Sequence, residues 1–280
     1  MKRMNRIGIF GYGYLGEAID ACFSAEGWEV VRVGRSATEG VEQGDLTVVE
    51  SLRTLKQKVG ELSHVVHCAS SGRGGVEAYG AVFEVGAANL VEVFPEAHLL
   101  FTSSSSVYAQ MNGEVVDETS EAEPDRETGQ ILRRAERNVL DANGTVMRLS
   151  GIYGDGRSVI LKKWLLGESK VEEDGRRMLN QIHRADAATA YLAVANQQLR
   201  GEIFNVSETH PKNQLSTLQW LADHYQRTLP ESVPRDLNRK RGWTHKTVSS
   251  AKLVSIGWRP KFATFTDAVD AIEPTLSLGN

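Results

Sequence analysis

The chain has 280 residues, of which 41% are hydrophobic and 24% charged, and its formal net charge is −4. This composition is that of a globular protein, and the weak negative charge excludes a general basic surface for nucleic acid or anionic lipid. Its two cysteines, Cys22 and Cys68, form no CxxC motif, which fits a reducing compartment. Because no apolar run approaches the roughly 20 residues of a membrane helix and no N-terminal signal is recognisable, we expect a cytoplasmic protein without nucleic-acid or membrane partners.

Strands and helices alternate along the chain. Apolar runs that end at glycine or small polar residues predict buried strands, and apolar residues at helical spacing predict helices. The expected strands are 6–10, 28–33, 64–68, 99–102, 145–149 and 202–206, and the expected helices are 15–26, 79–93, 127–140, 185–195 and 217–225. This order predicts an α/β fold with a parallel sheet covered on both faces. After about residue 150 the alternation loosens, which indicates a smaller, partly interleaved second lobe.

A glycine-rich loop, Gly11-Tyr12-Gly13-Tyr14-Leu15-Gly16, lies between the first expected strand and the first expected helix. It matches GxGxxG, in which one glycine permits a tight turn, the next lets a pyrophosphate approach the backbone, and the third lets the helix pack on the strand. Free N–H groups at the start of the helix, near Tyr14 and Leu15, then hold the phosphates. The motif in this context predicts dinucleotide binding, and the alternative is a tight turn without a ligand.

The second expected strand ends in VVRVGRS, which contains Arg32, Arg35 and Ser36 and no acid at the position where NAD enzymes bind the ribose hydroxyls. Arginine there suits a 2′-phosphate, so the sequence favours NADP over NAD. Glu29 and Glu39 flank this region, and the alternative is that Arg35 is a solvated loop residue.

Several further segments carry a family resemblance. They are VVHCAS at 65–70, FTSSSSVY at 101–108, MRLSGIYGDGR at 147–157, NQIHRADAATAY at 180–191, FNVSE at 204–208 and VSSAKLVSIGWRP at 248–260. Together with the glycine loop, and in this order, they resemble the extended short-chain dehydrogenases/reductases, the branch that holds NAD(P)-dependent epimerases and dehydratases. The resemblance implies a doubly wound Rossmann-like domain at 1–150 that also receives about 180–208, and a smaller substrate lobe at 151–280.

The resemblance also assigns individual residues. It implies that Ser104 hydrogen-bonds the reacting hydroxyl or carbonyl, and that Asp45 and Leu46 match a GDL element whose carboxylate meets the adenine amino group. Ala69 and Ser70 belong to the cofactor site. In the second lobe, Asn180 is a substrate candidate, and Arg157 either faces a phosphate or carboxylate or caps a loop.

The catalytic helix departs from the family pattern. The family uses a tyrosine and, four residues later, a lysine as its acid/base pair, and these positions are Thr128 and Leu132 here. No tyrosine occurs between 109 and 152, so a shift of register does not restore the pair. Thr128 can at most orient a hydroxyl or a water, and Tyr108 is the nearest phenol to Ser104, a candidate replacement acid.

Two interpretations therefore remain open. In the first, the protein is an NAD(P)-dependent oxidoreductase or an epimerase/dehydratase-like enzyme that acts on a small polar or sugar-like substrate. In the second, it is a catalytically degenerate NADP(H)-binding sensor or regulatory protein. No metal site is expected, since His64 and His67 lie three apart on a strand and point to opposite faces. The resemblance further suggests a homodimer formed through the helices at 76–93 and 127–140.

Overall fold

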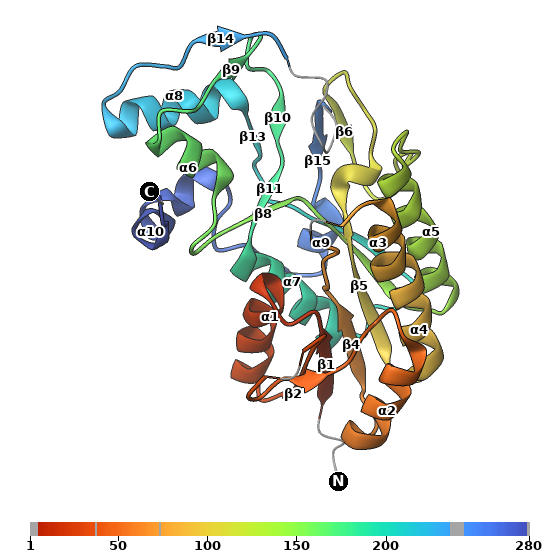
Figure 1. The fold of residues 1–280 in the computed structure, drawn as a ribbon. Coiled ribbons are helices and arrows are strands. Elements are labelled where there is room, and N and C mark those ends of the chain that lie inside the picture. The colour runs from red at the N-terminus through yellow and green to blue at the C-terminus, as the bar shows by residue number, and fades with distance from the viewer. Residues whose placement is uncertain (1–4, 37, 73, 236–243, 279–280) are drawn as a thin grey trace.

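The computed structural model describes residues 5–36, 38–72, 74–235 and 244–278 (Figure 1). At its centre is a seven-stranded sheet in the order β3-β2-β1-β4-β5-β7-β12, and all neighbouring strands are parallel. The strands are β1 (Arg6–Phe10), β2 (Glu29–Gly34), β3 (Glu42–Gln43), β4 (His64–His67), β5 (His98–Ser104), β7 (Thr145–Leu149) and β12 (Ile203–Val206). The predicted Rossmann-like α/β fold is therefore confirmed, and the six strands expected from the sequence are present to within two residues at each end.

Helices cover both faces of this sheet (Figure 1). One face carries α1 (Tyr14–Ala25), α7 (Arg184–Asn196) and α9 (Ala251–Ser255), and the other carries α2 (Val49–Val59), α3 (Val76–Gly80), α4 (Gly86–Val93) and α5 (Glu127–Asp141). Each face has its own hydrophobic core, because successive strand residues such as Leu99 and Leu100 point to opposite sides. None of the helices within the described residues is long and apolar enough to cross a membrane.

The segment expected as one helix at 79–93 is interrupted. Between α3 and α4 the chain forms a single π-helical stretch, Ala81–Val85, in which the backbone hydrogen bonds are reorganised. The buried His67 ring fills this irregularity, since its Nε2 is hydrogen-bonded to the Val82 carbonyl at 2.8 Å. These helices pack beside α5, and the homodimer expected through them stays a prediction.

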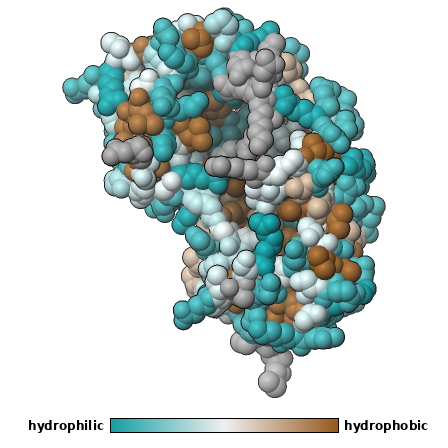
Figure 2. Space-filling view, in the orientation of Figure 1, coloured by the Kyte–Doolittle hydropathy of each residue, from teal (hydrophilic) through white to brown (hydrophobic). Residues whose placement is uncertain are grey.

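A second lobe with its own core lies beyond the sheet, in the upper left of Figure 1. It contains α6 (Val159–Leu165), α8 (Gln214–Tyr225), α10 (Val269–Ile272), the 3-10 turns Phe265–Ala268 and Glu273–Thr275, and the strand pairs β9 (Val171–Glu172) with β14 (Ser232–Val233) and β10 (Met178–Leu179) with β13 (Lys212–Asn213). The molecule narrows between the two lobes, and hydrophobic residues are scattered among hydrophilic ones on this face (Figure 2).

Two further strand pairs connect the lobes. They are β8 (Gly151–Tyr153) with β11 (Gln181–His183), and β6 (Glu114–Val116) with β15 (Lys246–Val248). After β11 the chain returns to the sheet through α7 and β12, so a segment late in the sequence completes the first lobe. The division of the chain at about residue 150 stays a prediction.

Candidate functional site

The predicted cofactor and catalytic residues gather at one edge of the sheet. Gly11 follows β1, Arg35 follows β2, Ala69 lies two residues after β4, and Ser104 ends β5. These strands are adjacent and parallel, so their carboxyl ends open to the same side. The chain continues from β1 to β2 on one side, while β4 lies on the other, which makes β1/β4 the switch point where ligands of such sheets bind.

The glycine loop has the shape of a phosphate cradle. Gly11 has a φ of +101°, and a Cβ there would lie 2.3 Å from the Ala69 backbone. A Cβ at Gly16 would lie 2.8 Å from the Gly11 carbonyl oxygen, so both positions require glycine. At Gly13, in contrast, the nearest atom to a Cβ is 4.0 Å away, which leaves open space directly before the first N–H groups of α1. The residues present therefore fit a pyrophosphate.

Residues expected around the adenosine lie beside this cradle. The Asp45 carboxylate is half-buried, and its Oδ1 accepts hydrogen bonds from the Thr47 backbone and hydroxyl at 2.8 and 2.7 Å. Leu46 is buried in the core, and Ser70 is exposed. Contact of Asp45 with an adenine amino group stays a prediction.

Arg32, within β2, and Arg35, directly after it, have different surroundings. The Arg32 Nε donates to the Asp20 carboxylate at 2.6 Å, and Tyr12 and Ser24 hydrogen-bond the same carboxylate. Arg32, which the sequence pattern offered for a 2′-phosphate, is therefore neutralised within the fold. Arg35 is exposed at the end of β2 and makes no ion pair with any of the described residues. Among the described residues at the carboxyl end of β2, Arg35 is therefore a cation without an ion-pair partner.

Alternation along β5 separates two neighbouring serines. The buried Ser103 hydroxyl donates to Glu136 at 2.6 Å. Ser104 is half-buried, and its Oγ accepts a hydrogen bond from the Ser106 backbone N–H at 3.2 Å. Because the Ser104 oxygen accepts this bond, its own proton is available for a substrate oxygen.

Tyr108 belongs to the buried network on the Ser103 side. Its hydroxyl accepts a hydrogen bond from Arg148 at 2.8 Å and lies 2.8 Å from the Asp117 carbonyl and 2.9 Å from Asn205 Oδ1. The side chain is fully buried, and this burial raises the pKa of the phenol. The Tyr108 hydroxyl thus already has three hydrogen-bond partners within the fold, and its role as a replacement acid stays a prediction.

The beginning of α5 lies against the end of β5. A Cβ at Gly129 would be 3.9 Å from the Ser106 carbonyl oxygen, so the first turn of α5 runs beside the short 3-10 turn Ser105–Val107. Thr128, in this first turn, is half-buried. Leu132, at the family's lysine position, is fully buried in the core. The role of Thr128 stays a prediction.

The two substrate candidates of the second lobe differ. The Asn180 amide donates to the Lys246 carbonyl and accepts from the Val248 N–H, both at 2.8 Å, so both of its ends hold β15 in place. The contact of Asn180 with a substrate stays a prediction. Arg157 is exposed, and its guanidinium lies 5.2 Å from the ring centroid of Tyr14 in the glycine loop.

Sequence reasoning missed two cations close to these residues. Arg184, the first residue of α7, has its guanidinium 4.7 Å from the centroid of the Tyr14 ring. Lys246 is buried, donates to the Tyr108 carbonyl at 2.7 Å, and has a pKa lowered to about 8 by desolvation. Neither stood out in the sequence, because each acquires its neighbours only through a contact between distant segments.

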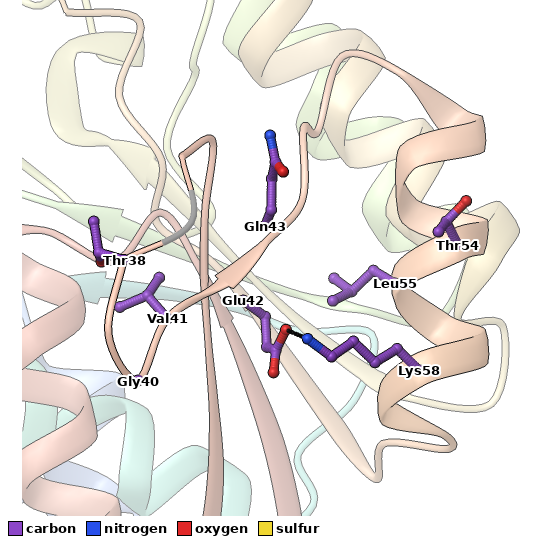
Figure 3. Close-up of a pocket in the computed structure, with 8 residues that line it drawn as sticks. All are labelled: Thr38, Gly40, Val41, Glu42, Gln43, Thr54, Leu55 and Lys58. Atoms are coloured by element: carbon purple, nitrogen blue, oxygen red, sulfur yellow. Dashed lines mark hydrogen bonds and ion pairs between the residues drawn. The ribbon is translucent and has the colours of Figure 1, made fainter.

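A hollow of about 540 Å³ lies elsewhere, between the short edge strand β3 and α2 (Figure 3). Its lining residues are Thr38, Gly40, Val41, Glu42, Gln43, Thr54, Leu55 and Lys58. The Glu42–Lys58 ion pair crosses it, and none of the predicted site residues lines it. We therefore place the candidate site at the carboxyl edge of the sheet and not in this hollow. His64 and His67 face different neighbours, Trp28 and Phe101, and no cluster of potential metal ligands occurs within the described residues.

Comparison with known proteins identifies the family. The model of the NAD-dependent epimerase/dehydratase family matches residues 9–207, which include the glycine loop, the end of β5, α7 and β12. The chain belongs to this family.

Individual relatives agree with this assignment. Protein YeeZ of Escherichia coli (strain K12) is 28% identical in an alignment of 226 residues that covers 74% of this chain and 80% of that protein. Among solved structures, the chain is similar to the ADP-L-glycero-D-manno-heptose-6-epimerase of Helicobacter pylori, with a TM-score of 0.79, 16% identity and 96% of each chain covered. The UDP-glucose 4-epimerase of Thermus thermophilus, a complex with NAD, has a TM-score of 0.74 and 21% identity over 92% of this chain and 94% of that chain. These two structures share the fold of the chain.

Proposed function

We propose that this protein binds NADP(H) at the glycine cradle and transfers hydride to or from a small polar or sugar-like substrate held by Ser104. The observation that carries this proposal is the convergence of the cradle, Arg35 and Ser104 at the carboxyl ends of four adjacent strands. Family membership supports a nicotinamide cofactor, as does the NAD complex of the T. thermophilus neighbour.

The chain's own residues divide the work as follows. The N–H groups at the start of α1 hold the pyrophosphate, and Arg35 with Ser36 holds a 2′-phosphate. Ser104 donates a hydrogen bond to the reacting oxygen of the substrate and keeps its proton, and Thr128 orients a water or a hydroxyl. When bound, the nicotinamide supplies the hydride acceptor or donor. With no tyrosine–lysine pair, the proton comes from water or substrate, and the missing general acid lowers the rate by about 10²–10⁴.

A second candidate function rests on one specific observation. At the position of the family's lysine stands Leu132, which is fully buried, so no cation can reach a nicotinamide ribose from there. This favours a nucleotide-binding sensor that has kept the fold without the chemistry. The sensor binds NADPH without consuming it, whereas the enzyme oxidises NADPH when a suitable carbonyl substrate is added.

A titration with NADPH, NADP, NADH and NAD, followed by nucleotide fluorescence and thermal shift, tests the proposal. We expect NADPH to bind most tightly, and Arg35→Ala to weaken NADPH about tenfold or more while it leaves NADH nearly unchanged. Arg53→Ala is the matched control, because Arg53 is half exposed on α2 and, among the described residues, its ion pairs are those with Glu50 and Glu92. If none of the four nucleotides bound, the proposal would be wrong.

If NADPH binds, a screen of small polar carbonyl compounds and sugar derivatives then separates the two functions. Substrate-dependent oxidation of NADPH that is lost in Ser104→Ala supports the enzyme. Binding without oxidation across the screen supports the sensor.

A further inference from the structure

Two arginines lie on the tyrosine of the glycine loop. The guanidinium carbon of Arg184 is 4.7 Å from the centroid of the Tyr14 ring, and that of Arg157 is 5.2 Å away. The three residues come from different segments: Tyr14 begins α1, Arg184 begins α7, and Arg157 lies in the loop after β8. Arg157 and Arg184, from later segments of the chain, thus both lie over the ring of Tyr14 in the nucleotide-binding motif.

The backbone fixes this arrangement. Gly154 and Arg157 exchange two backbone hydrogen bonds of 2.9 Å, which close the loop, and the Gly156 N–H donates to the Thr275 hydroxyl at 2.8 Å. Gly154 has a φ of +149°, and a Cβ there would lie 3.0 Å from Arg184 Cγ and 3.1 Å from the Tyr14 hydroxyl oxygen. A glycine is therefore required for the loop to approach the stack this closely.

Most N–H groups of Arg157 and Arg184 have no hydrogen-bond acceptor among the described residues. Stacking on an aromatic ring uses the face of a guanidinium and leaves the N–H groups of its edge free for a planar or tetrahedral oxyanion. Arg157 makes no ion pair and no side-chain hydrogen bond with any residue that the structure describes. Arg184 lies against the Tyr14 hydroxyl and forms a long ion pair of 3.9 Å with Asp155, whose side chain is more than half exposed.

We propose that Arg157 and Arg184 form a phosphate-binding pair at the mouth of the glycine loop. Two guanidinium groups with one carboxylate, Asp155 at 3.9 Å from Arg184, leave an excess of positive charge, and arginine binds phosphate oxygens through paired N–H groups. Tyr14 connects this pair to the cradle, because it contributes both the first N–H of α1 and the ring on which the arginines stack. The phosphate is either the pyrophosphate of the dinucleotide or a phosphoryl group of the substrate, and the proposal rests on the proposed function in this respect.

The test compares four variants with the wild-type chain: Arg184→Gln, Arg184→Lys, Arg157→Gln and the double Arg157→Gln/Arg184→Gln. The matched control is Arg176→Gln, which removes a charge of the same lobe from an 80% exposed side chain that is paired only with Asp174. The probes are NADPH, ADP-ribose, which keeps the pyrophosphate, adenosine, which lacks it, and inorganic phosphate added to the NADPH-saturated protein. Thermal unfolding of each variant shows whether it is folded, and the exposed Arg157 provides a substitution that leaves the core intact.

Two results support the pair. If the dinucleotide is the source, NADPH and ADP-ribose weaken about tenfold or more in each glutamine variant, while adenosine is unchanged and Arg184→Lys is intermediate. If the substrate is the source, the nucleotides keep their affinity and the variants lose the binding of inorganic phosphate by the NADPH-saturated protein.

The proposal is overturned if every probe binds all folded variants within about twofold of the control, a difference too small for the loss of a charge-assisted hydrogen bond. Failure of the proposed function looks different, because the wild-type chain itself would then bind no nucleotide. In that case inorganic pyrophosphate, with wild type and Arg184→Gln compared, still tests the arginine pair.

Discussion

Two neighbouring serines, Ser103 and Ser104, separate the structural and functional sides of β5. Ser103 points into a buried network in which Glu136 and Arg148 are ion-paired at 2.8 Å and Tyr108 closes the far end. Ser104 lies at the carboxyl end of β5, and its Oγ accepts a hydrogen bond from the Ser106 backbone N–H, the one hydrogen bond of this side chain among the described residues. The two residues are of the same type, so it is the alternation of side chains along the strand that decides which hydroxyl is hydrogen-bonded in the core and which can donate to a ligand.

The largest effect is expected on the buried side. Arg148→Met leaves the fully buried Glu136 carboxylate with Arg133 as its only cationic partner, so the free energy of unfolding should fall by about 3–5 kcal/mol in urea denaturation. Arg134→Met is the control, on the helix α5 that also carries Glu136. The ion pair of Arg134 with Glu84 is partly exposed and should contribute less than about 1 kcal/mol. Equal losses in the two variants would contradict the network.

On the open side, Gly13→Val should separate binding from folding. The φ of Gly13 is −149° and its Cβ position is free, so we expect a melting temperature close to that of the wild type. The valine fills the space meant for the pyrophosphate, and NADPH affinity should fall about 100-fold, or about 2.7 kcal/mol, in a fluorescence titration. Unchanged affinity in the folded variant would place the nucleotide elsewhere.

The serines themselves give a matched pair of substitutions. Ser103→Ala removes a buried hydrogen bond to a carboxylate and should cost about 1.5–3 kcal/mol of stability without changing nucleotide affinity. Ser104→Ala should change stability by less than about 0.5 kcal/mol and lower turnover about 10²-fold or more. Denaturation and NADPH-oxidation assays of both variants check this, and exchanged effects would contradict the assignment of the two faces.

The smallest effect concerns the amino end of the same sheet, where polar residues are buried. The rings of His64 and His98 are tilted against each other with their centroids 5.3 Å apart, and burial lowers their pKa values from 6.5 to about 4 and about 3. The unfolded chain therefore binds more protons, so this stabilisation is present above about pH 6.5 and is lost as the pH falls toward 4. Urea denaturation at pH 7 and pH 5 should show a smaller difference between the two pH values for His98→Gln than for the wild type, and an equal difference would exclude His98.

Most of the sheet could be predicted from sequence because its signals are local. Five of the six expected strands end at glycine or small polar residues, and the glycine motif predicts both the turn after β1 and the helix that follows it. The start of α5 likewise follows from a helical periodicity, whereas the 3-10 turn Ser105–Val107 was not predicted.

Features that depend on long-range contacts could not be predicted in this way. The Tyr108 hydroxyl is hydrogen-bonded to Asn205, 97 residues away, and the Asn180 amide to β15. Because these partners are distant in the sequence, no local pattern predicts the contacts. Arg184 meets Tyr14 only because α7 packs on α1. The π-helical stretch at 81–85 is hydrogen-bonded through the Val82 carbonyl to the His67 ring of β4, a long-range contact, and helical spacing alone predicts a regular helix there.

Hydrogen–deuterium exchange with and without saturating NADPH tests the central claim most directly, namely that the carboxyl edge of the sheet is the functional edge. We predict slower exchange at the glycine loop 11–16, at 35–36 and 69–70, and at 104–106, with no change at the amino edge around 63–64, 97–98 and 144–145. Protection of the amino edge instead, or of the hollow between β3 and α2, would contradict the account.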